Sequence, residues 1–214
     1  YVVPRAAAQE PYSFIEKDEL ILACALILAV VILFLVLASM NSRRQKTLIY
    51  YAENDELTGI FNRRAFEHKV RSWMDSEECT GKQAFLMMDV DLFKEINDVY
   101  GHAVGDKVLK QVGKILRETF RGSDILGRIG GDEFMVFMKD ITEKELAARK
   151  AEELKEKLLE IDFPELKGRK ITASMGIAFF PDAGESYKEV YICADKALYE
   201  AKRSGRNGYH IYHS

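Results

Sequence analysis

The chain has 214 residues, of which 48% are hydrophobic and 30% are charged, with a formal net charge of −3. This balance excludes a disordered or low-complexity chain, and the lack of a basic excess argues against nucleic acid as a partner. The three cysteines, Cys24, Cys79 and Cys193, are an odd number without metal-binding spacing, so we expect neither a disulfide framework nor a zinc site. The length suits one domain of ordinary size with an appendage.

An uncharged run of 21 residues at positions 20–40 predicts a transmembrane helix. At about 1.5 Å per residue the run reaches roughly 30 Å, enough to cross a bilayer. It is apolar all round, unlike a buried helix of a soluble domain, and it is longer than the apolar core of a signal peptide. Because Arg43, Arg44 and Lys46 follow it, the positive-inside rule places its C-terminal side in the cytoplasm. We therefore expect a single-pass protein of the inner (cytoplasmic) membrane that contacts the lipid bilayer through residues 20–40.

The segments on either side of this run have different expected roles. The chain begins with Tyr1 rather than Met, so residues 1–19 are expected to be the juxtamembrane remnant of an extracytoplasmic region. Residues 41–54 contain no Pro or Gly and can continue the helix into the cytoplasm as a stiff signalling connector, which could form a brief coiled coil in a dimer. A simple spacer is the alternative interpretation of this connector.

Residues 55–214 predict one α/β domain, a mixed sheet covered by helices. Apolar residues at helical spacing predict helices over Phe61–Ser76, His102–Phe120 and Tyr187–Lys202. A further helix is expected to begin at Thr142, with Glu145 as its capping-box partner, and to end before Pro164. Short apolar runs predict strands, at Ala84–Asp91, at two places in Asp124–Lys139 around Gly130-Gly131, at Lys170–Phe180 and at an edge position over Tyr209–Tyr212.

Two acidic clusters lie at the ends of predicted strands. One strand ends in Asp89-Val90-Asp91, and the hairpin contains Asp132 and Glu133 directly after its two glycines. Carboxylates at the end of an apolar strand are costly unless they meet solvent or a cation, and hard oxygen ligands favour Mg²⁺ or Mn²⁺. Carboxylate-held divalent ions are suited to nucleotidyl transfer. The alternative is that both acid pairs are ordinary turn residues.

Four motifs extend this interpretation. They read DELTGIFNRR at 55–64, DVDLFKEINDVYGHAVGD at 89–106, RIGGDEF at 128–134 and ADKALYEAKRSGRN at 194–207. Together they closely resemble the GGDEF family of diguanylate cyclases, in the family's order and spacing. The resemblance implies a nucleotidyl-cyclase-like α+β fold with a mixed, mainly antiparallel central sheet. It also implies a homodimer that condenses two GTP molecules into cyclic di-GMP and two pyrophosphates, each subunit holding one GTP.

The resemblance implies a metal centre built from the two acidic clusters. Asp89, Asp132 and the carbonyl of Val90 would ligate two Mg²⁺ (or Mn²⁺) ions per active site. Glu133 would either touch a metal or help to deprotonate the ribose 3′-hydroxyl, and Asp132 is counted with it among the catalytic residues. Because neighbouring residues on a strand point to opposite faces, Asp132 and Glu133 are not expected to play identical roles unless the turn twists them.

Substrate recognition is implied for the segment after the first acidic cluster. Asn97 and Asp106 match the guanine-reading pair of the family, and an ionised Asp can accept from the N1–H and the exocyclic amine of guanine. The backbone N–H groups of Leu92 and Phe93 would cradle phosphate, and Lys94 would lie beside the phosphate path as a further catalytic residue. The alternative is that Asn97 caps a turn and Asp106 begins a helix.

Four more basic positions complete the implied sites. Lys202 and Arg206 match the residues that hold the β- and γ-phosphates. Arg121 and Asp124 match the RxxD pattern of the family's inhibitory product site, for which a plain helix-to-strand turn is the alternative. Arg128 is expected either to touch phosphate or to pair with an acid.

A catalytically silent receptor for GTP or cyclic di-GMP on the same fold is the main alternative function, and an adapter is a third. Silent members lack a metal or glycine position, and this chain has both glycines and all the acids of the motif. An adapter would not need the guanine-reading and phosphate-binding residues. The sequence therefore favours the enzyme.

Overall fold

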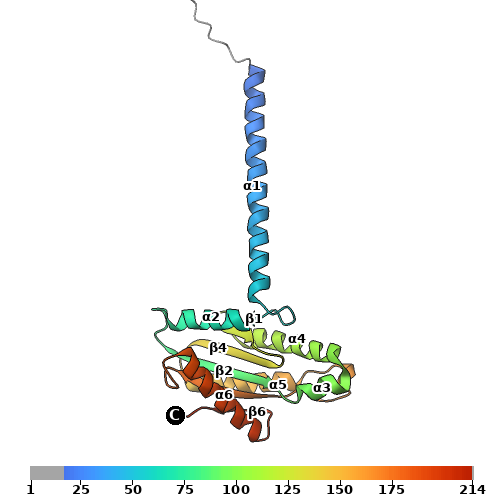
Figure 1. The fold of residues 1–214 in the computed structure, drawn as a ribbon, viewed down its shortest axis with the longest axis vertical. Helices are drawn as coiled ribbons and strands as arrows, with labels where there is room; N and C mark the ends of the chain where they lie inside the picture. The colour runs from blue at the N-terminus through green and yellow to red at the C-terminus, as the bar shows by residue number, and fades with distance from the viewer. Residues whose placement is uncertain (1–16, 214) are drawn as a thin grey trace, which may run out of the picture. The chain divides into compact units, whose positions relative to one another are not determined.

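The computed structural model describes residues 17–213, which form two compact units divided between residues 49 and 50. Residues 1–16, most of the predicted extracytoplasmic remnant, lie outside the described residues. The helix that begins the described chain and the domain that follows it are considered separately below (Figure 1).

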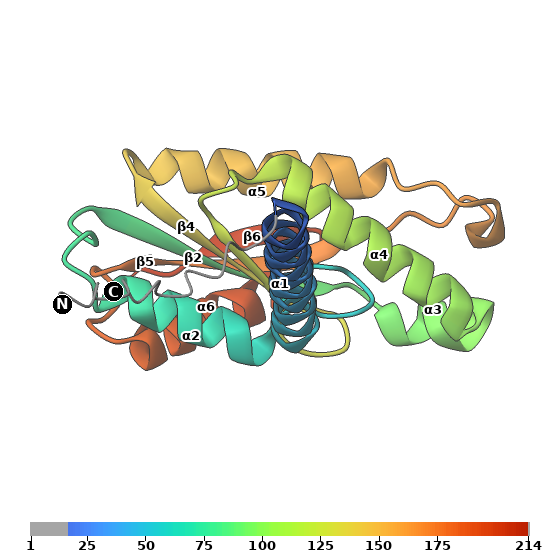
Figure 2. The same cartoon turned by 90° about the horizontal axis from the view of Figure 1, so that it is seen from above.

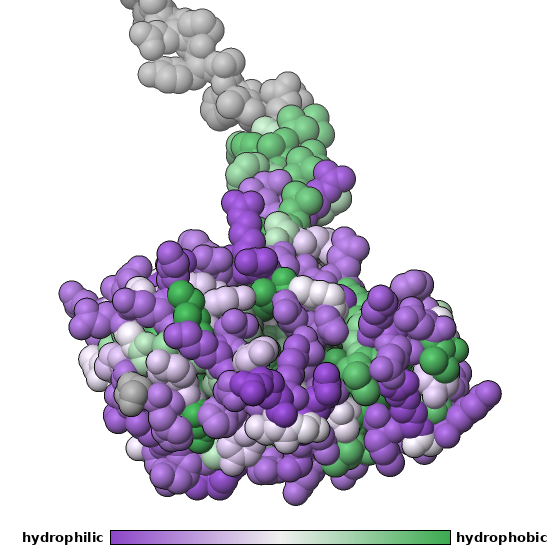
Figure 3. Space-filling view, turned by 60° about the horizontal axis from the view of Figure 1, so that its bottom comes forward, coloured by the Kyte–Doolittle hydropathy of each residue, from purple (hydrophilic) through white to green (hydrophobic). Residues whose placement is uncertain are grey.

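Helix α1 (Lys17–Glu53) is continuous over 37 residues. Its segment Leu20–Ser42 has a mean hydropathy of 3.5 and none of it is buried, so by length and composition it could cross a membrane. The apolar surface of this helix is visible in Figure 3, in contrast to the largely hydrophilic surface of the domain. Because α1 reaches Glu53, residues 41–53 continue the helix, as their lack of Pro and Gly predicted.

The domain is built on a six-stranded sheet with the order β1-β3-β4-β2-β5-β6. The strands are β1 (Phe61–Asn62), β2 (Lys82–Val90), β3 (Ile125–Arg128), β4 (Glu133–Ile141), β5 (Ala173–Phe180) and β6 (Gly208–Ile211). The three central pairings are antiparallel, whereas β1 pairs with β3 and β6 with β5 in parallel. The predicted mixed, mainly antiparallel sheet is therefore confirmed.

Helices cover both faces of this sheet (Figure 2). One face packs against α2 (Arg63–Met74) and α6 (Tyr187–Arg203), and the other against α4 (His102–Thr119) and α5 (Lys144–Leu159). Side chains of a strand alternate between faces, so in β2 Phe85 and Met87 join the first core while Leu86 and Met88 join the second. All four are buried, which fixes the register of β2 and hence the position of the acid at its end.

Two element boundaries differ from the prediction near the N-terminal side of the domain. The helix predicted from Phe61 begins at Arg63, because Phe61 and Asn62 form β1 and the Asn62 side chain caps α2 by accepting from the Ala65 N–H at 3.0 Å. Helix α3 (Phe93–Tyr100) was not predicted as a separate element. It has eight residues and follows the N-cap residue Leu92, which has a left-handed backbone (φ 55°) and makes no side-chain cap hydrogen bond.

The capping box predicted at Thr142 is wrong. Helix α5 begins at Lys144, and its N-cap residue Glu143 makes no side-chain cap hydrogen bond. A capping box does occur at α6, where the Ser186 hydroxyl accepts from the Glu189 N–H and the Glu189 carboxylate accepts from the Ser186 N–H. Strand β5 begins at Ala173 rather than at Lys170, after the short 3₁₀ helix Pro164–Leu166.

Candidate active site

The two acidic clusters meet where β2 ends and β4 begins. The β2–β4 register pairs Asp89 directly with Glu133, and the Val90 N–H donates to the Asp132 carbonyl at 3.2 Å. Residues opposite one another in an antiparallel pair present their side chains on the same face. The sheet thus brings together acids that are about forty residues apart in sequence, as the motifs predicted.

Asp89 is more enclosed than Glu133, which is exposed: the Asp89 side chain is only 15% exposed. Burial raises the pKa of its carboxyl, and the nearby charges of Asp132 and Glu133 raise it further. An ion pair with Lys202, whose Nζ lies 2.9 Å from Asp89 Oδ2, opposes this rise without cancelling it. Within the described residues 17–213, neither Asp132 nor Glu133 takes part in an ion pair, so Lys202 is the one cation paired with these three acids.

The turn between β3 and β4 brings Glu133 back over the glycine pair. The Ile129 N–H donates to the Glu133 carbonyl at 2.9 Å and closes the turn. A Cβ atom at Gly130 would lie 2.7 Å from Glu133 Oε2, a distance that real Cβ atoms do not tolerate. Glycine at this position therefore makes room for the Glu133 carboxylate, while Gly131 is exposed and has open space around it.

Arg128 holds the same turn from the other side. Its guanidinium donates to the Gly131 carbonyl at 2.7 Å and to both carboxylate oxygens of Asp55, at 3.1 and 3.2 Å. Burial alone would raise the pKa of Asp55, but hydrogen bonds from Thr58 and the charge of Arg128 outweigh it and hold that pKa below its usual value. Of the two expectations for Arg128, the structure shows the pairing with an acid.

The segment after Asp91 turns sharply into α3. Leu92 adopts the left-handed conformation, half-exposed, and Phe93 is buried as the first residue of α3, while Lys94 is exposed. The first N–H groups of a helix have no partner within the helix, so the start of α3 offers donors beside the acidic cluster. A helix of eight residues gives only a weak dipole, and the cradle depends mainly on these N–H groups.

Asn97 and Asp106 come together across the α3–α4 corner. Asn97 is half-buried in α3, and a Cβ atom at Gly105 would lie 2.0 Å from Asn97 Oδ1. Gly105 is thus the residue that lets the Asn97 side chain lie against α4, next to Asp106, which is exposed. The two residues predicted to read guanine thus lie on helices that pack against one another, Asn97 half-buried and Asp106 exposed.

Lys202 and Arg206 follow one another at the end of α6 but differ in their surroundings. Lys202, in the last turn, is paired with Asp89, whereas Arg206 is exposed in the turn after the helix at φ 63°. Among the ion pairs of residues 17–213, none includes Arg206. Lys202 is thus paired directly with an acid of the cluster, whereas Arg206 is linked to it through its turn, because the Asn207 N–H donates to Asp91.

Sequence reasoning missed the role of Asp91, which is 6% exposed. Its carboxylate accepts from the hydroxyls of Thr172 and Ser174, at 2.8 and 2.7 Å, and from the Asn207 N–H at 3.0 Å. Asp91 thus ties the turn that carries Arg206 to the end of β2. The sequence places Asp91 at the end of the apolar run beside Asp89. Nothing in the motif shows whether such an acid binds a metal ion or, as here, accepts hydrogen bonds that hold a turn in place.

Arg121 and Asp124 form a turn, as the alternative interpretation expected. The Asp124 carboxylate accepts from the N–H groups of Arg121 and Lys139, at 2.9 and 3.1 Å, and the Arg121 side chain is exposed. Beside them lies a cavity of about 310 Å³ whose lining also includes Gly59 and Arg117. The turn leaves the Arg121 guanidinium able to meet a ligand, while most of the acceptor capacity of Asp124 serves the backbone.

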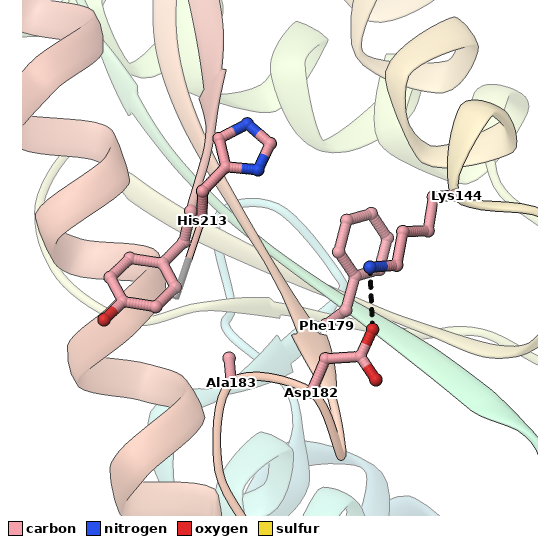
Figure 4. Close-up of a pocket in the computed structure, with 6 residues that line it drawn as sticks. Lys144, Phe179, Asp182, Ala183 and His213 are labelled. Atoms are coloured by element: carbon pink, nitrogen blue, oxygen red, sulfur yellow. Dashed lines mark ion pairs between the residues drawn. The ribbon is translucent and has the colours of Figure 1, made fainter.

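A smaller cavity of about 120 Å³ lies at the other end of β5 (Figure 4). Lys144 points at Asp182 across it, with Nζ 2.7 Å from the carboxylate, and Lys82 pairs with the same carboxylate at 3.3 Å. Its one carboxylate is therefore already paired within the protein, and none of the motif residues lines the cavity.

The acidic cluster suits a divalent ion by its chemistry. Asp89, Asp132 and Glu133 supply only hard oxygen donors, and their mutual repulsion is what raises the pKa of Asp89 beyond the effect of burial. Within residues 17–213, no three acidic, histidine or cysteine side chains already stand at ligand spacing. The ion pair with Lys202 occupies Asp89 Oδ2 instead.

Comparisons with known proteins agree with the motifs. The profile of a family described as "Diguanylate cyclase, GGDEF domain" matches residues 52–208. The chain is 40% identical over 159 residues to the probable diguanylate cyclase DgcT of Escherichia coli, which covers 73% of this chain and 35% of that protein. It is 36% identical over 180 residues to the bifunctional diguanylate cyclase/cyclic di-GMP phosphodiesterase MucR of Pseudomonas aeruginosa, covering 84% of this chain and 26% of that protein. The chain thus spans about a quarter to a third of these curated relatives.

Solved structures give the same fold. The coiled coil and GGDEF domain of DgcB from Caulobacter crescentus, in complex with c-di-GMP, matches with a TM-score of 0.76 at 25% identity, over 86% of this chain and 98% of that one. A truncated form of TpbB (YfiN) from Pseudomonas aeruginosa that comprises only the GGDEF domain matches with a TM-score of 0.69 at 32% identity, over 75% of this chain and 94% of that one.

Proposed function

The chain belongs to the GGDEF diguanylate cyclase family, and we propose that it condenses two GTP molecules into cyclic di-GMP with release of two pyrophosphates. The observation that carries this proposal is the pairing of Asp89 with Glu133 at the β2–β4 edge, beside Asp132. It brings three carboxylates together with one paired ammonium, that of Lys202. Such a group of hard oxygen donors is what a metal-dependent nucleotidyl-transfer site requires.

Two Mg²⁺ or Mn²⁺ ions per site would be held by Asp89, Asp132, Glu133 and the Val90 carbonyl. The chemistry that such ions supply when bound is polarisation of the α-phosphate and neutralisation of the leaving pyrophosphate. Glu133, exposed and folded over Gly130, is the residue available to accept the proton of the 3′-hydroxyl. Asp132, on the other side of the turn, serves mainly as a ligand.

GTP is bound in two parts. Asn97 and Asp106 read the guanine edge, because an ionised Asp accepts from the N1–H and the amine that adenine does not present together. The N–H groups of Leu92 and Phe93 receive the phosphates at the start of α3, with Lys94 beside them. The cations Lys202 and Arg206 hold the β- and γ-phosphates.

Synthesis takes place in a homodimer. One site presents one 3′-hydroxyl and one α-phosphate, so closing both phosphodiester bonds requires two GTP sites facing one another. The domain 55–214 is the cyclase, residues 41–54 connect it to the membrane, and residues 20–40 anchor it in the inner membrane with the domain in the cytoplasm. The basic residues that follow the apolar run support this orientation.

Product inhibition is proposed at Arg121 and Asp124. The exposed Arg121 guanidinium can donate to guanine O6 and N7 or to phosphate oxygens of cyclic di-GMP. The adjoining cavity of about 310 Å³ offers space for part of such a ligand. Bound product would keep the two GTP sites apart, and productive dimers would in return bind the product less tightly.

The test is to incubate the full chain, reconstituted in lipid nanodiscs, with GTP and Mg²⁺ and to identify products by mass spectrometry. Cyclic di-GMP from the wild type and none from Asp132→Asn supports the enzyme. Binding of cyclic di-GMP without synthesis would make the chain a receptor. If the chain neither binds nor synthesises cyclic di-GMP, the adapter is the remaining function.

A further inference from the structure

The Asp89–Lys202 ion pair joins residues to which the proposed function gives different partners. Lys202 Nζ lies 2.9 Å from Asp89 Oδ2, between side chains that are 35% and 15% exposed. The pair connects the last turn of α6 to the end of β2, so it depends on the packing of α6 against the sheet rather than on local sequence. It lies on the same carboxylate that the proposed ions require.

An ammonium group and a divalent ion compete for such a carboxylate. The second oxygen, Oδ1, does not avoid the conflict, because an ion there would lie only a few ångströms from the ammonium, and like charges repel strongly in a half-buried site. Lys202, on a flexible four-carbon stem and about one-third exposed, can leave without unfolding the helix. Arg203, the next residue, is already paired with Glu200.

We propose that Lys202 is the resident cation of the acidic site, which neutralises Asp89 until a divalent ion arrives and transfers to the nucleotide phosphates when it does. This inference rests on the proposed function. It makes ion and nucleotide binding mutually dependent: the ion must displace Lys202, and the triphosphate gives Lys202 a new anionic partner. A divalent ion alone therefore binds weakly, and a nucleotide raises its affinity.

Arg206 supplies a matched control. It stands four residues after Lys202, carries the same charge and is also assigned to phosphate, but it belongs to none of the ion pairs found among residues 17–213. Lys202→Gln and Arg206→Gln thus each remove one positive charge, the first from the last turn of α6 and the second from the turn that follows it. Only Lys202→Gln breaks the ion pair with Asp89. Lys202→Arg keeps the charge and the pair.

The experiment measures Mn²⁺ binding to the full chain in detergent micelles from the electron paramagnetic resonance signal of free Mn²⁺. It is done with Mn²⁺ alone and then with the α,β-methylene analogue of GTP, which cannot be cleaved at that bond. Without nucleotide, Lys202→Gln should bind Mn²⁺ at least about 5-fold more tightly than the wild type, whereas Arg206→Gln and Lys202→Arg stay near the wild-type value. After the Mn²⁺ that the analogue chelates in the absence of protein has been subtracted, the analogue should raise the Mn²⁺ affinity of the wild type by a similar factor, and that of Lys202→Gln by less.

The inference is overturned if Lys202→Gln gains no affinity for Mn²⁺ alone, or if Arg206→Gln gains as much, since a general charge effect would then suffice. In that case Mn²⁺ binding and cyclic di-GMP synthesis by the wild type would leave the proposed function intact. Absence of Mn²⁺ binding even with the analogue would reject both. If Lys202→Gln fails to fold, a nucleotide-independent Mn²⁺ affinity in the wild type still overturns the inference.

Discussion

The pair formed by Asp55 and Arg128 should be a main contributor to the stability of the domain. Arg128 donates to both Asp55 oxygens and to the Gly131 carbonyl, so one guanidinium fastens the segment after α1 to the turn that carries the acids. Asp55 also accepts from the N–H and the hydroxyl of Thr58, at 2.9 and 2.7 Å. The two side chains are only 15% and 24% exposed.

The expected cost of Asp55→Ala follows from these contacts. Hydrogen bonds to a charged group contribute about 1.5–3 kcal/mol, and removing one partner leaves the other unsatisfied. Because the pair is partly solvated and the four hydrogen bonds share one carboxylate, we expect a loss of about 2–3 kcal/mol in the free energy of unfolding. For a domain of this size each kcal/mol lowers Tm by about 2–4 °C.

The assay is urea unfolding of the full chain in micelles, followed by the fluorescence of Trp73. Trp73 is the only tryptophan, and it lies in the domain with Lys139 Nζ 3.7 Å from its ring centroid, so it reports on the domain and not on α1. Glu67→Gln is the control: it breaks an ion pair of similar length, 2.8 Å to Arg71, but with side chains 47% and 38% exposed. It should cost less than about 0.5 kcal/mol. An equal loss of unfolding free energy in Asp55→Ala and Glu67→Gln would show that the Asp55–Arg128 pair contributes no more than an exposed ion pair.

The role of Asp55 can also be checked by the pH dependence of the difference in unfolding free energy between the wild type and Asp55→Ala. The pKa of Asp55 is lowered in the folded protein, so its contribution is present above the unfolded value, about 3.9, and is lost as the pH falls through the folded value. The stability gap between the wild type and Asp55→Ala should be constant at neutral pH and should shrink only below about pH 4. A gap that instead closed near neutral pH would contradict the assignment of Asp55.

Three further predictions concern the site. Burial and neighbouring acids raise the pKa of Asp89, so ionisation of this carboxyl destabilises the folded domain once the pH rises through that pKa. Asp89→Asn should therefore be at least as stable as the wild type at pH 7 in the Trp73 unfolding assay. Its rate of cyclic di-GMP synthesis should fall about 10³-fold. Gly105→Ala places a Cβ 2.0 Å from Asn97 Oδ1, so the Asn97 side chain must move. We expect the KM for GTP to rise about 10-fold and the preference of the enzyme for GTP over ATP, measured by competition between the two nucleotides, to decrease. Arg121→Ala should leave initial rates unchanged and remove the slowing that accompanies product accumulation in progress curves.

Much of the fold was predictable because its cores are built on long periodic segments. The apolar run of β2 and the apolar face of α4 are buried as the spacing predicts. Helix α3 was not predicted because it is short and because its N-cap residue, Leu92, is not a residue type that caps helices. Thr142 failed as a cap because Glu143 and not Thr142 immediately precedes the helix.

The motifs indicated which residues to consider for the site, but not how these residues pair. Lys202 contacts Asp89 and Arg128 contacts Asp55 across long stretches of sequence, and only the packing of α6 and the β3–β4 turn brings each pair together. Asp91 resembles a metal ligand in the sequence, and only its burial and its three donors show it to be a tether.

Nucleotidyl transfer from GTP to GTP at the acidic cluster is tested most directly by the ratio of pyrophosphate released to cyclic di-GMP formed. The ratio is measured for the full chain in nanodiscs, with Mg²⁺ and then with excess chelator. We expect two pyrophosphates for each cyclic di-GMP, and loss of both products with chelator or in Asp132→Asn. Pyrophosphate release without cyclic di-GMP, or synthesis by Asp132→Asn at the wild-type rate, would contradict nucleotidyl transfer at this cluster.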